Sequence, residues 1–186
     1  MTDANAVQDG TREILDYWLR DVGAAGWWQR SDATDAEIAR RFRPLWEEWR
    51  SRTAASFLGS AEEALAGAIL FDQFSRNMFR GHADAFSTDP LAVAIARGAI
   101  DKGYDDAVGA DERIFFYLPF EHSESIEDQK RSLALFTALG QDETLEFARK
   151  HHDIIARFGR FPHRNAVLGR KDRPGEAEAA AEGANW

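Results

Sequence analysis

The stretch LAGAILFDQFSRNMF, residues 65–79, predicts a helix that is apolar on most of its sides. Leu65, Ile69, Asp72 and Arg76 follow one another at helical spacing and therefore share one face. Phenylalanine residues make a second face apolar as well. A helix without a polar face is usually buried. We therefore expect this segment to lie in the core and to carry Asp72 and Arg76 into the interior with it.

Two charged and two amide side chains on this helix therefore need partners inside the protein. Asp72 and Arg76 are four residues apart, in the acid-first order that favours an ion pair within a helix. Gln73 and Asn77 lie beside them, also four residues apart. Burying that much polar surface is costly unless it is paired. The sequence leaves two interpretations open: an internal ion pair, or a polar pocket lined by all four residues.

Helical periodicity extends over the rest of the chain, and no segment shows the alternating β-branched pattern of a strand. Short links between successive helices favour antiparallel pairs. We therefore predict an all-α fold, a stack of antiparallel helical hairpins. The expected helices number about seven and span roughly 11–22, 32–49, 60–79, 89–103, 111–118, 125–140 and 145–159.

Capping residues and prolines set the expected boundaries. Thr11 is the expected cap of the first helix. Pro44 should kink the second helix or shift its start, and Pro119 should break the fifth. The expected parts of the chain are a polar N-terminal extension (1–10), a single all-α domain (11–170) and a polar, flexible tail (171–186).

The composition excludes several classes of protein. Among 186 residues, 23 are basic and 32 acidic, a formal net charge of −9 that disfavours electrostatic binding to nucleic acid or to anionic membranes. The chain has no cysteine, which excludes disulfides, thiolate metal sites and iron–sulfur clusters. The first ten residues are polar, unlike a secretory signal, and no apolar run approaches the roughly 20 residues of a membrane span. We expect a soluble, cytoplasmic protein.

A second polar cluster, YLPFEHSE at residues 117–124, includes the proline of the fifth helix. Glu121 and Glu124 bracket His122, and neighbouring carboxylates favour the charged form of a histidine. Such a group could serve as a general acid or supply metal ligands. The alternative is that Ser125 and Glu124 only cap and favour the start of the next helix. Capping leaves Glu121 and His122 unexplained.

Positive charge gathers in a third segment. Residues 157–173 hold six basic residues against one acidic residue, and Arg160, His163, Arg164 and Asn165 lie among them. Arginine presents a planar fork that matches a carboxylate or a phosphate. Two interpretations stay open: the segment docks on the acidic residues of the second cluster, or it binds an anionic ligand.

A further histidine belongs to a helix core. His151 shares an apolar stripe with Phe147 and Ile155. A lone histidine on such a face is more often a hydrogen-bonded core residue than a catalyst. His152, beside Asp153, is expected to be solvated.

Three phrases, FDQFSRNMFRG (71–81), FYLPFEHSES (116–125) and RFGRFPHRNAVLGR (157–170), together resemble an uncharacterised, mainly bacterial family catalogued as domain of unknown function 924. The resemblance extends from about Ile14 to Arg170. It implies a tetratricopeptide-like (TPR-like) helical fold and carries no established activity, substrate or cofactor. The polar positions that match the family pattern are Asp72, Gln73, Arg76, Asn77, Glu121, His122, Glu124, Arg160, His163, Arg164 and Asn165.

These segments favour a pocket that binds a small anionic ligand, either a carboxylate or a phosphate. Acid, amide, arginine and histidine side chains from three separated segments fit a convergent pocket better than an extended groove. His122 or His163, beside Glu121 or Glu124, could then perform acid–base chemistry. The expected ligand-binding residues are Asp72, Gln73, Arg76, Asn77, Tyr117, Glu124, Arg160, Arg164 and Asn165.

Two alternatives stay open. TPR-like folds often hold a peptide or a chain terminus in a concave groove, here with Arg76 and Arg164 as a clamp and Trp27 and Trp28 as walls. The polar segments could instead interlock as a closed network that only stabilises the fold. A metal site would draw on His122, His163, Glu121 and Asp72. These four residues lack a recognised ligand spacing, and we assign neither a metal nor a cofactor.

Overall fold

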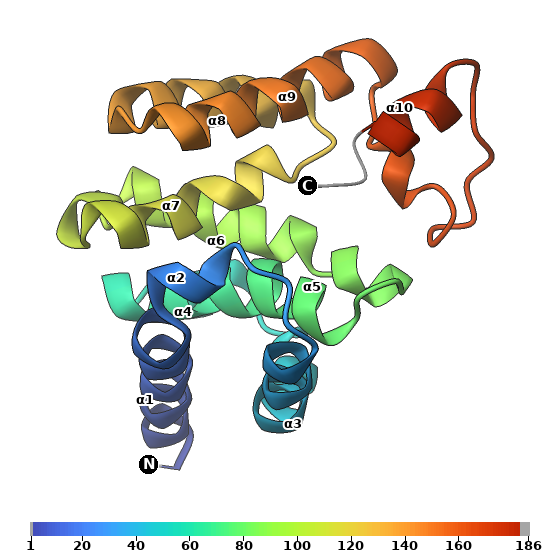
Figure 1. The fold of residues 1–186 in the computed structure, drawn as a ribbon. Coiled ribbons are helices and arrows are strands. Elements are labelled where there is room, and N and C mark those ends of the chain that lie inside the picture. Colours follow the sequence, from blue (N-terminus) through green and yellow to red (C-terminus); the bar gives the residue numbers. More distant parts are fainter. Residues whose placement is uncertain (1, 183–186) are drawn as a thin grey trace. The chain divides into compact units, whose positions relative to one another are not determined.

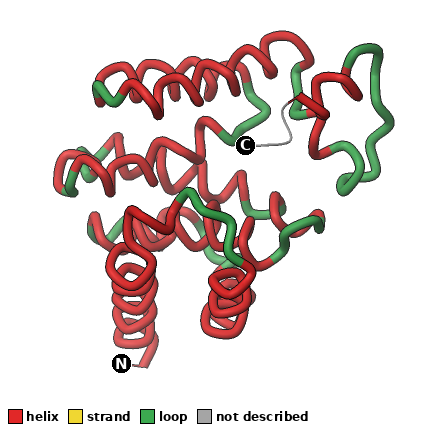
Figure 2. Tube along the Cα trace, in the orientation of Figure 1, coloured by secondary structure: helices red, strands yellow, loops and turns green. Residues whose placement is uncertain are grey.

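The computed structural model describes residues 2–182, and over this range the chain consists of helices and loops without strands (Figure 2). The predicted all-α fold is confirmed. None of the described helices has the length and apolar character of a membrane span.

The described chain forms two compact units. The first holds residues 2–80 and 84–119, and the second holds residues 81–83 and 120–182. The boundary falls after Pro119, within helix α7 (Ala110–Glu121).

The first unit is built from six complete helices, most of α7 and several short helical turns (Figure 1). The helices are α1 (Thr2–Leu15), α2 (Gly23–Trp27), α3 (Asp32–Trp49), α4 (Ala61–Ala68), α5 (Ser75–Met78) and α6 (Asp89–Asp101). Two π-helical segments, η1 (Asp16–Val22) and η3 (Ile69–Phe74), continue α1 and α4. The 3-10 helices are η2 (Ala54–Phe57), η4 (Ala83–Phe86), which begins in the second unit, and η5 (Asp105–Ala107).

In the second unit, α8 (Ile126–Leu139) packs along α9 (Asp142–Phe158), as Figure 1 shows. Ser125 caps α8, and Gly140 and Gly159 end α8 and α9 in the left-handed conformation, as their positions predict. The 3-10 helix η6 (Pro162–Arg164) follows and packs against α10 (Glu176–Glu182).

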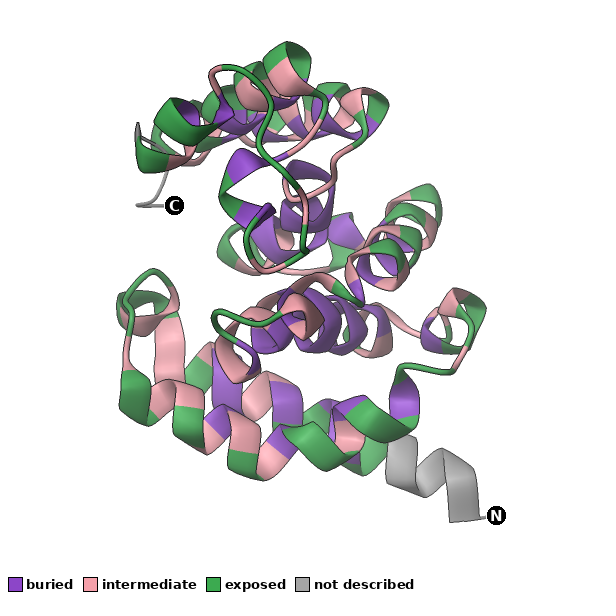
Figure 3. Cartoon of the chain, turned by 90° about the vertical axis from the view of Figure 1, so that its right-hand side faces the viewer, coloured by how far each residue is buried: buried purple, intermediate pink, exposed green. Residues whose placement is uncertain are grey.

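The stretch that the sequence places in the core runs through α4, η3 and α5 without a break. Leu65 and Phe74 are buried, as are the residues of η3 except Gln73 (Figure 3). The ring centroid of Phe74 lies 4.7 Å from that of Phe42 and 5.4 Å from that of Trp18. Aromatic rings from α3 and η1 therefore enclose the π-helical segment.

Hydroxyl groups supply hydrogen bonds to the carbonyls of this segment. Thr88 Oγ1 donates to the carbonyl of Phe71 at 2.8 Å, and Ser75 Oγ lies 3.0 Å from the same oxygen. Trp46 Nε1 donates to Ser75 Oγ at 2.9 Å. A π-helical turn departs from the regular α pattern of hydrogen bonds, and these buried groups hold it in place.

The N-terminal boundary differs from prediction. Helix α1 begins at Thr2 rather than at Thr11, which is buried inside the helix. Residues 2–10 are therefore helical and not an extension. At Gly10 a Cβ atom would lie 2.9 Å from the ring of Trp49, so the helix approaches α3 closely at this glycine. A capping rule does not detect such a contact.

Both prolines lie inside helices. Pro44 falls within α3, which runs unbroken from Asp32 to Trp49, and Pro119 falls within α7, which continues to Glu121. The prediction that Pro119 breaks the helix is therefore wrong. Proline removes one backbone N–H, and two residues before a helix end this loss affects little of the hydrogen-bond ladder.

The segment expected to be a flexible tail contains α10. Glu176 and Ala179 are buried against the rest of the second unit. This segment is ordered rather than flexible because side chains of the preceding loop bind the carboxylate of Glu176.

We expect Pro44→Ala to raise the free energy of unfolding by about 1 to 3 kcal/mol, because it restores an N–H to the interior of α3 at an exposed position. Pro90→Ala is the matched control, since proline is compatible with the first turn of α6 and its loss should be neutral or slightly destabilising. Urea unfolding monitored by circular dichroism measures both. A lower stability of Pro44→Ala would contradict this prediction.

Candidate functional site

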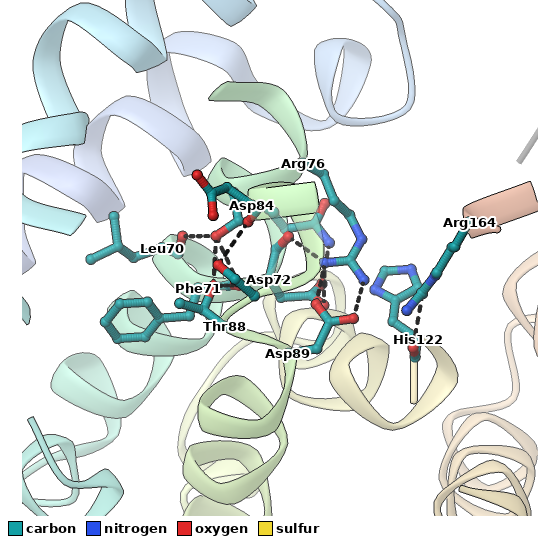
Figure 4. Close-up of polar contacts among 12 residues, drawn as sticks. Leu70, Phe71, Asp72, Arg76, Asp84, Thr88, Asp89, His122 and Arg164 are labelled. Carbon is teal, nitrogen blue, oxygen red and sulfur yellow. Dashed lines mark hydrogen bonds and ion pairs between the residues drawn. The ribbon is translucent and has the colours of Figure 1, made fainter. Parts of the chain in front are cut away.

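In the first unit, Arg76 lies between two carboxylates (Figure 4). Its Nη1 is 3.2 Å from Oδ1 of the buried Asp72 and 2.9 Å from Asp89 Oδ1, and its Nη2 donates to Asp89 Oδ2 at 3.1 Å. Gln73 Nε2 donates to Asp72 Oδ2 at 2.6 Å. Burial lowers the pKa of Arg76, but the two carboxylates raise it above its ordinary value. The predicted ion pair within the helix is present, and Asp89 at the start of α6 extends it.

Asn77 and Tyr117, two further predicted site residues, also form bonds within the first unit. Asn77 Nδ2 donates to Asp35 Oδ1 at 2.7 Å, and Arg80 Nε donates to Asp35 Oδ2 at 2.7 Å. Burial raises the pKa of Asp35, but hydrogen bonds from Arg80 and Asn77 bring it below its ordinary value. The Tyr117 hydroxyl donates to Asp105 Oδ2 at 2.9 Å. Burial and this carboxylate raise the pKa of Tyr117, so the phenol stays neutral.

The second unit brings Glu121, His122 and His151 together, and we call these three residues the histidine centre. Glu121 ends α7, His122 follows it directly, and His151 belongs to α9. One ligand atom from each of them lies within 4.8 Å of the others. His151 Nδ1 is 3.2 Å from Glu121 Oε1, and the ring centroids of the two histidines are 5.9 Å apart.

Side chains from the same unit hold the chain at the end of α7. Gln129 Nε2, in α8, donates to the carbonyls of Glu121 at 2.6 Å and Ser123 at 2.7 Å. Arg164 Nη2 donates to the carbonyl of His122 at 2.9 Å, as Figure 4 shows. The last carbonyls of a helix have no partner within it. These bonds therefore fix the turn that carries Glu121 and His122.

His151 is the buried histidine that its apolar stripe predicts. It is 7% exposed, and its Nδ1 lies 2.9 Å from the carbonyl of Phe147. Burial first, and then the charge of His122, lower the pKa of His151 to about 3. The imidazole is therefore neutral at pH 7. The contact between His151 and Glu121 could not be predicted from spacing, because the apolar stripe already accounted for the position of His151.

The loop after α9 docks on Glu124. Arg170 Nη1 and Nη2 donate to its two carboxylate oxygens at 2.7 and 2.9 Å, and the backbone N–H of Phe161 donates to Glu124 Oε1 at 2.8 Å. Burial raises the pKa of Glu124, but the bonds from Arg170 and Phe161 bring it below its ordinary value. The interpretation of Glu124 as a residue that only favours the start of α8 is wrong. Its carboxylate holds the loop.

Arg160 and Asn165 bind the C-terminal segment. Arg160 Nε and Nη2 donate to the carboxylate of Glu176 at 2.9 and 2.6 Å, and Asn165 Nδ2 donates to Glu176 at 3.0 Å and to Asp172 at 2.8 Å. The hydrogen bond from Arg160, opposed by burial, lowers the pKa of Glu176 to about 2. The sequence offered no signal for Glu176, because it lies in the stretch interpreted as a tail.

Phe161 links Arg164 and His163 to the histidine centre. The guanidinium carbon of the buried Arg164 is 4.5 Å from the centroid of the Phe161 ring. The same centroid lies 5.5 Å from the ring centroids of both His163 and His151. The helix η6 therefore brings one guanidinium and one exposed imidazole close to the centre.

The predicted site residues divide between the two units. Glu121, His122, Glu124, Arg160, His163, Arg164 and Asn165 come together in the second unit, whereas Asp72, Gln73, Arg76, Asn77 and Tyr117 belong to the first. The expected convergence of all three segments stays a prediction. The possible metal ligands that lie together in the second unit are Glu121, His122 and His151. The sequence suggested His163 and Asp72 as the other ligands of such a site, and neither belongs to this group.

Comparisons with known proteins assign the chain to a family of unknown function. Residues 14–184 match the model of a bacterial protein family of unknown function (DUF924). The chain is similar to the solved structure of ATU0120, a protein of unknown function from Agrobacterium tumefaciens, at 42% sequence identity and a TM-score of 0.88. The match covers 95% of this chain and 99% of that chain. No curated protein matches. The resemblance carried by the three sequence phrases is confirmed.

We expect Arg76→Gln to lower the free energy of unfolding by about 3 to 5 kcal/mol, because it removes a guanidinium held between two carboxylates, one of them buried. Arg80→Gln is the matched control. Its ion pair with Asp35 is more exposed and should contribute about 1 kcal/mol or less. Urea unfolding of both variants measures the difference, and equally small losses would show that burial of the Arg76 pair is unimportant.

The pKa of His151 predicts a stability that depends on pH. It is about 3 in the folded chain and about 6.5 in an unfolded one, so between these values the unfolded chain binds the additional proton. The contribution of the neutral His151 to the free energy of unfolding is complete above about pH 6.5 and is lost as the pH falls toward 3. We expect the folding equilibrium constant to fall up to about tenfold per pH unit across this range.

Equilibrium unfolding of metal-free protein between pH 7 and pH 4 measures this dependence. His151→Gln should weaken it, and His152→Gln, which changes the adjacent solvated histidine, should retain it. The same pH dependence in both variants would contradict the assignment to His151.

Proposed function

The chain belongs to this bacterial family of unknown function, and from its own residues we propose that the second unit binds a small anionic ligand, a carboxylate or a phosphate. The proposed binding residues are Arg164, His163 and His122. The observation that carries the proposal is that the buried Arg164 guanidinium and the His163 imidazole both lie close to the Phe161 ring, while the same guanidinium bonds to the backbone of His122 at the end of α7.

Arg164 is favoured over the other arginines of the basic loop. Arg160 and Arg170 each direct two guanidinium nitrogens at one carboxylate, that of Glu176 or Glu124. Both arginines therefore hold segments of the second unit together, whereas Arg164 bonds to the turn that carries Glu121 and His122. Within the second unit, Arg164 contacts the carbonyl of His122 and an aromatic ring.

His122 is the proposed acid–base group. It is half-buried, whereas the neighbouring His151 is buried, so His122 is the histidine of the centre that a ligand would reach. Because Arg164 bonds to the backbone of His122, an anion on that guanidinium would lie near this imidazole. The reaction class that fits is proton transfer to or from a substrate bearing a carboxylate or phosphate.

The two other functions have less support. Arg76, expected to clamp a peptide, lies between two carboxylates of the chain. Trp27, expected to line a groove, donates from Nε1 to the carbonyl of Trp18 at 2.7 Å and packs in a helix junction. A closed structural network explains the pairs of Arg160 and Arg170, but it gives no reason for two imidazoles to gather beside Arg164.

Isothermal titration of the full chain with phosphate, and separately with succinate, in buffer freed of metal ions with a chelating resin tests the proposal. We expect one of the two anions to bind saturably. Arg164→Gln should weaken its binding at least about tenfold, because a hydrogen bond to a charged group contributes about 1.5 to 3 kcal/mol. Lys171→Gln removes an exposed positive charge from the same segment and should bind like the wild type.

A second variant is needed because Arg164 is buried and Arg164→Gln can fail to fold. His163 is exposed, so His163→Gln should fold normally and still weaken anion binding. The proposal fails if the wild-type chain binds neither anion, or if folded Arg164→Gln and His163→Gln bind as tightly as the wild type.

A further inference from the structure

We propose that Glu121, His122 and His151 form a binding site for a late first-row divalent metal ion, with Zn²⁺ as the first candidate. The site lies wholly within the second unit. It shares His122 with the anion site proposed above, but it takes a different class of ligand, and its other two residues, Glu121 and His151, do not belong to that site.

The donor set selects the kind of metal. Two imidazole nitrogens and one carboxylate oxygen are typical ligands of Zn²⁺ and of neighbouring transition ions, whereas Ca²⁺ and Mg²⁺ prefer oxygen donors alone. Three protein ligands also leave one position of a tetrahedral ion open. Zinc sites of that kind bind water or a substrate at the fourth position.

The geometry requires only small side-chain movements. Two donors that bind one Zn²⁺ at about 2.1 Å are about 3.4 Å apart in a tetrahedral arrangement. One ligand atom from each residue of the histidine centre already lies within 4.8 Å of the others. Because α7 ends at Glu121, the adjacent side chains of Glu121 and His122 do not have to diverge as they would inside a helix.

The hydrogen bond of His151 fixes the form of its ring. A carbonyl oxygen only accepts, so the 2.9 Å contact between Nδ1 and the Phe147 carbonyl places the proton on Nδ1. The lone pair is then on Nε2, which is the atom available to a metal. Metal-binding histidines usually donate their other N–H to a carbonyl or a carboxylate. The Phe147 carbonyl is that acceptor for His151, and to reach an ion on Nε2 the Glu121 carboxylate would turn away from Nδ1.

Burial and access also fit a metal ion. Glu121 is 3% exposed, and carboxylates in such positions are usually paired or coordinate a metal. His122 is half-buried, so the centre keeps a path to solvent. Gln129 and Arg164 fix the carbonyls of Glu121 and His122, and thereby hold two of the three ligands before any ion binds.

The full chain, freed of metal with EDTA and dialysed into buffer without phosphate or carboxylates, provides the test. Titration with Co²⁺, followed by its visible absorption, and with Zn²⁺, followed by calorimetry, should show one ion per chain. His122→Gln, His151→Gln and Glu121→Gln should each weaken binding at least about tenfold, because even the loss of an outer-shell partner typically costs 10- to 100-fold. His152→Gln is the matched control and should bind normally.

Circular dichroism establishes which variants are folded. His151→Gln removes a buried side chain, so His122→Gln, at a half-buried position, keeps the test decisive if His151→Gln unfolds. The proposal is overturned if the wild type binds neither ion saturably, or if folded variants of the centre bind as tightly as His152→Gln. Because the anion titration is free of metal ions and the metal titration contains no phosphate or carboxylate, each proposal can fail without the other.

Discussion

An ionised side chain that leaves water must exchange its hydration for opposite charge and hydrogen bonds, and this requirement shapes both units. In each unit an arginine joins segments that are distant in sequence. Arg76 reaches Asp89, 13 residues later, and so links α5 to the start of α6. Arg160 reaches the buried Glu176, 16 residues later, and so docks α10 on the loop after α9. The ion pairs therefore decide how irregular segments attach to the helices.

The same requirement separates structural charge from functional chemistry. Arg160 and Arg170 each bind one carboxylate through two guanidinium nitrogens. The histidine centre is different, because a buried carboxylate there lies beside an imidazole that burial keeps neutral. Its three residues bring atoms of the kind that bind metal ions within 4.8 Å of one another. That contrast directs the search for function to the end of α7 rather than to the more basic loop.

Spacing along the chain predicts what lies within one or two helical turns. The pair of Asp72 and Arg76 follows from a four-residue separation, and the burial of His151 follows from its apolar stripe. The partner of Arg170 does not follow, because Glu124 is 46 residues away and is reached only when the loop folds back. The surplus of positive charge indicated the acidic residues of the second cluster as one possible partner, and Arg170 does bind Glu124, but the surplus could not select that pair.

The candidate site was predictable in part for the same reason. Glu121 and His122 stood out because capping could not account for them. His151 did not stand out, because burial on an apolar stripe was a sufficient explanation of its position. The apolar stripe assigned His151 one role, that of a core residue. The structure shows a second role, because the same face of α9 also brings His151 to Glu121 at the end of α7.

Arg164 connects the two proposals physically. Its bond to the carbonyl of His122 holds the turn that presents two of the three proposed metal ligands. The open position of a three-ligand ion would accept an anion, and a guanidinium beside that turn would stabilise the same negative charge. Arg164 would then have two roles: it holds the backbone at His122, and it stabilises the charge of the bound anion. Loss of its charge alone should weaken anion binding, whereas loss of its bond to His122 should loosen the metal ligands as well.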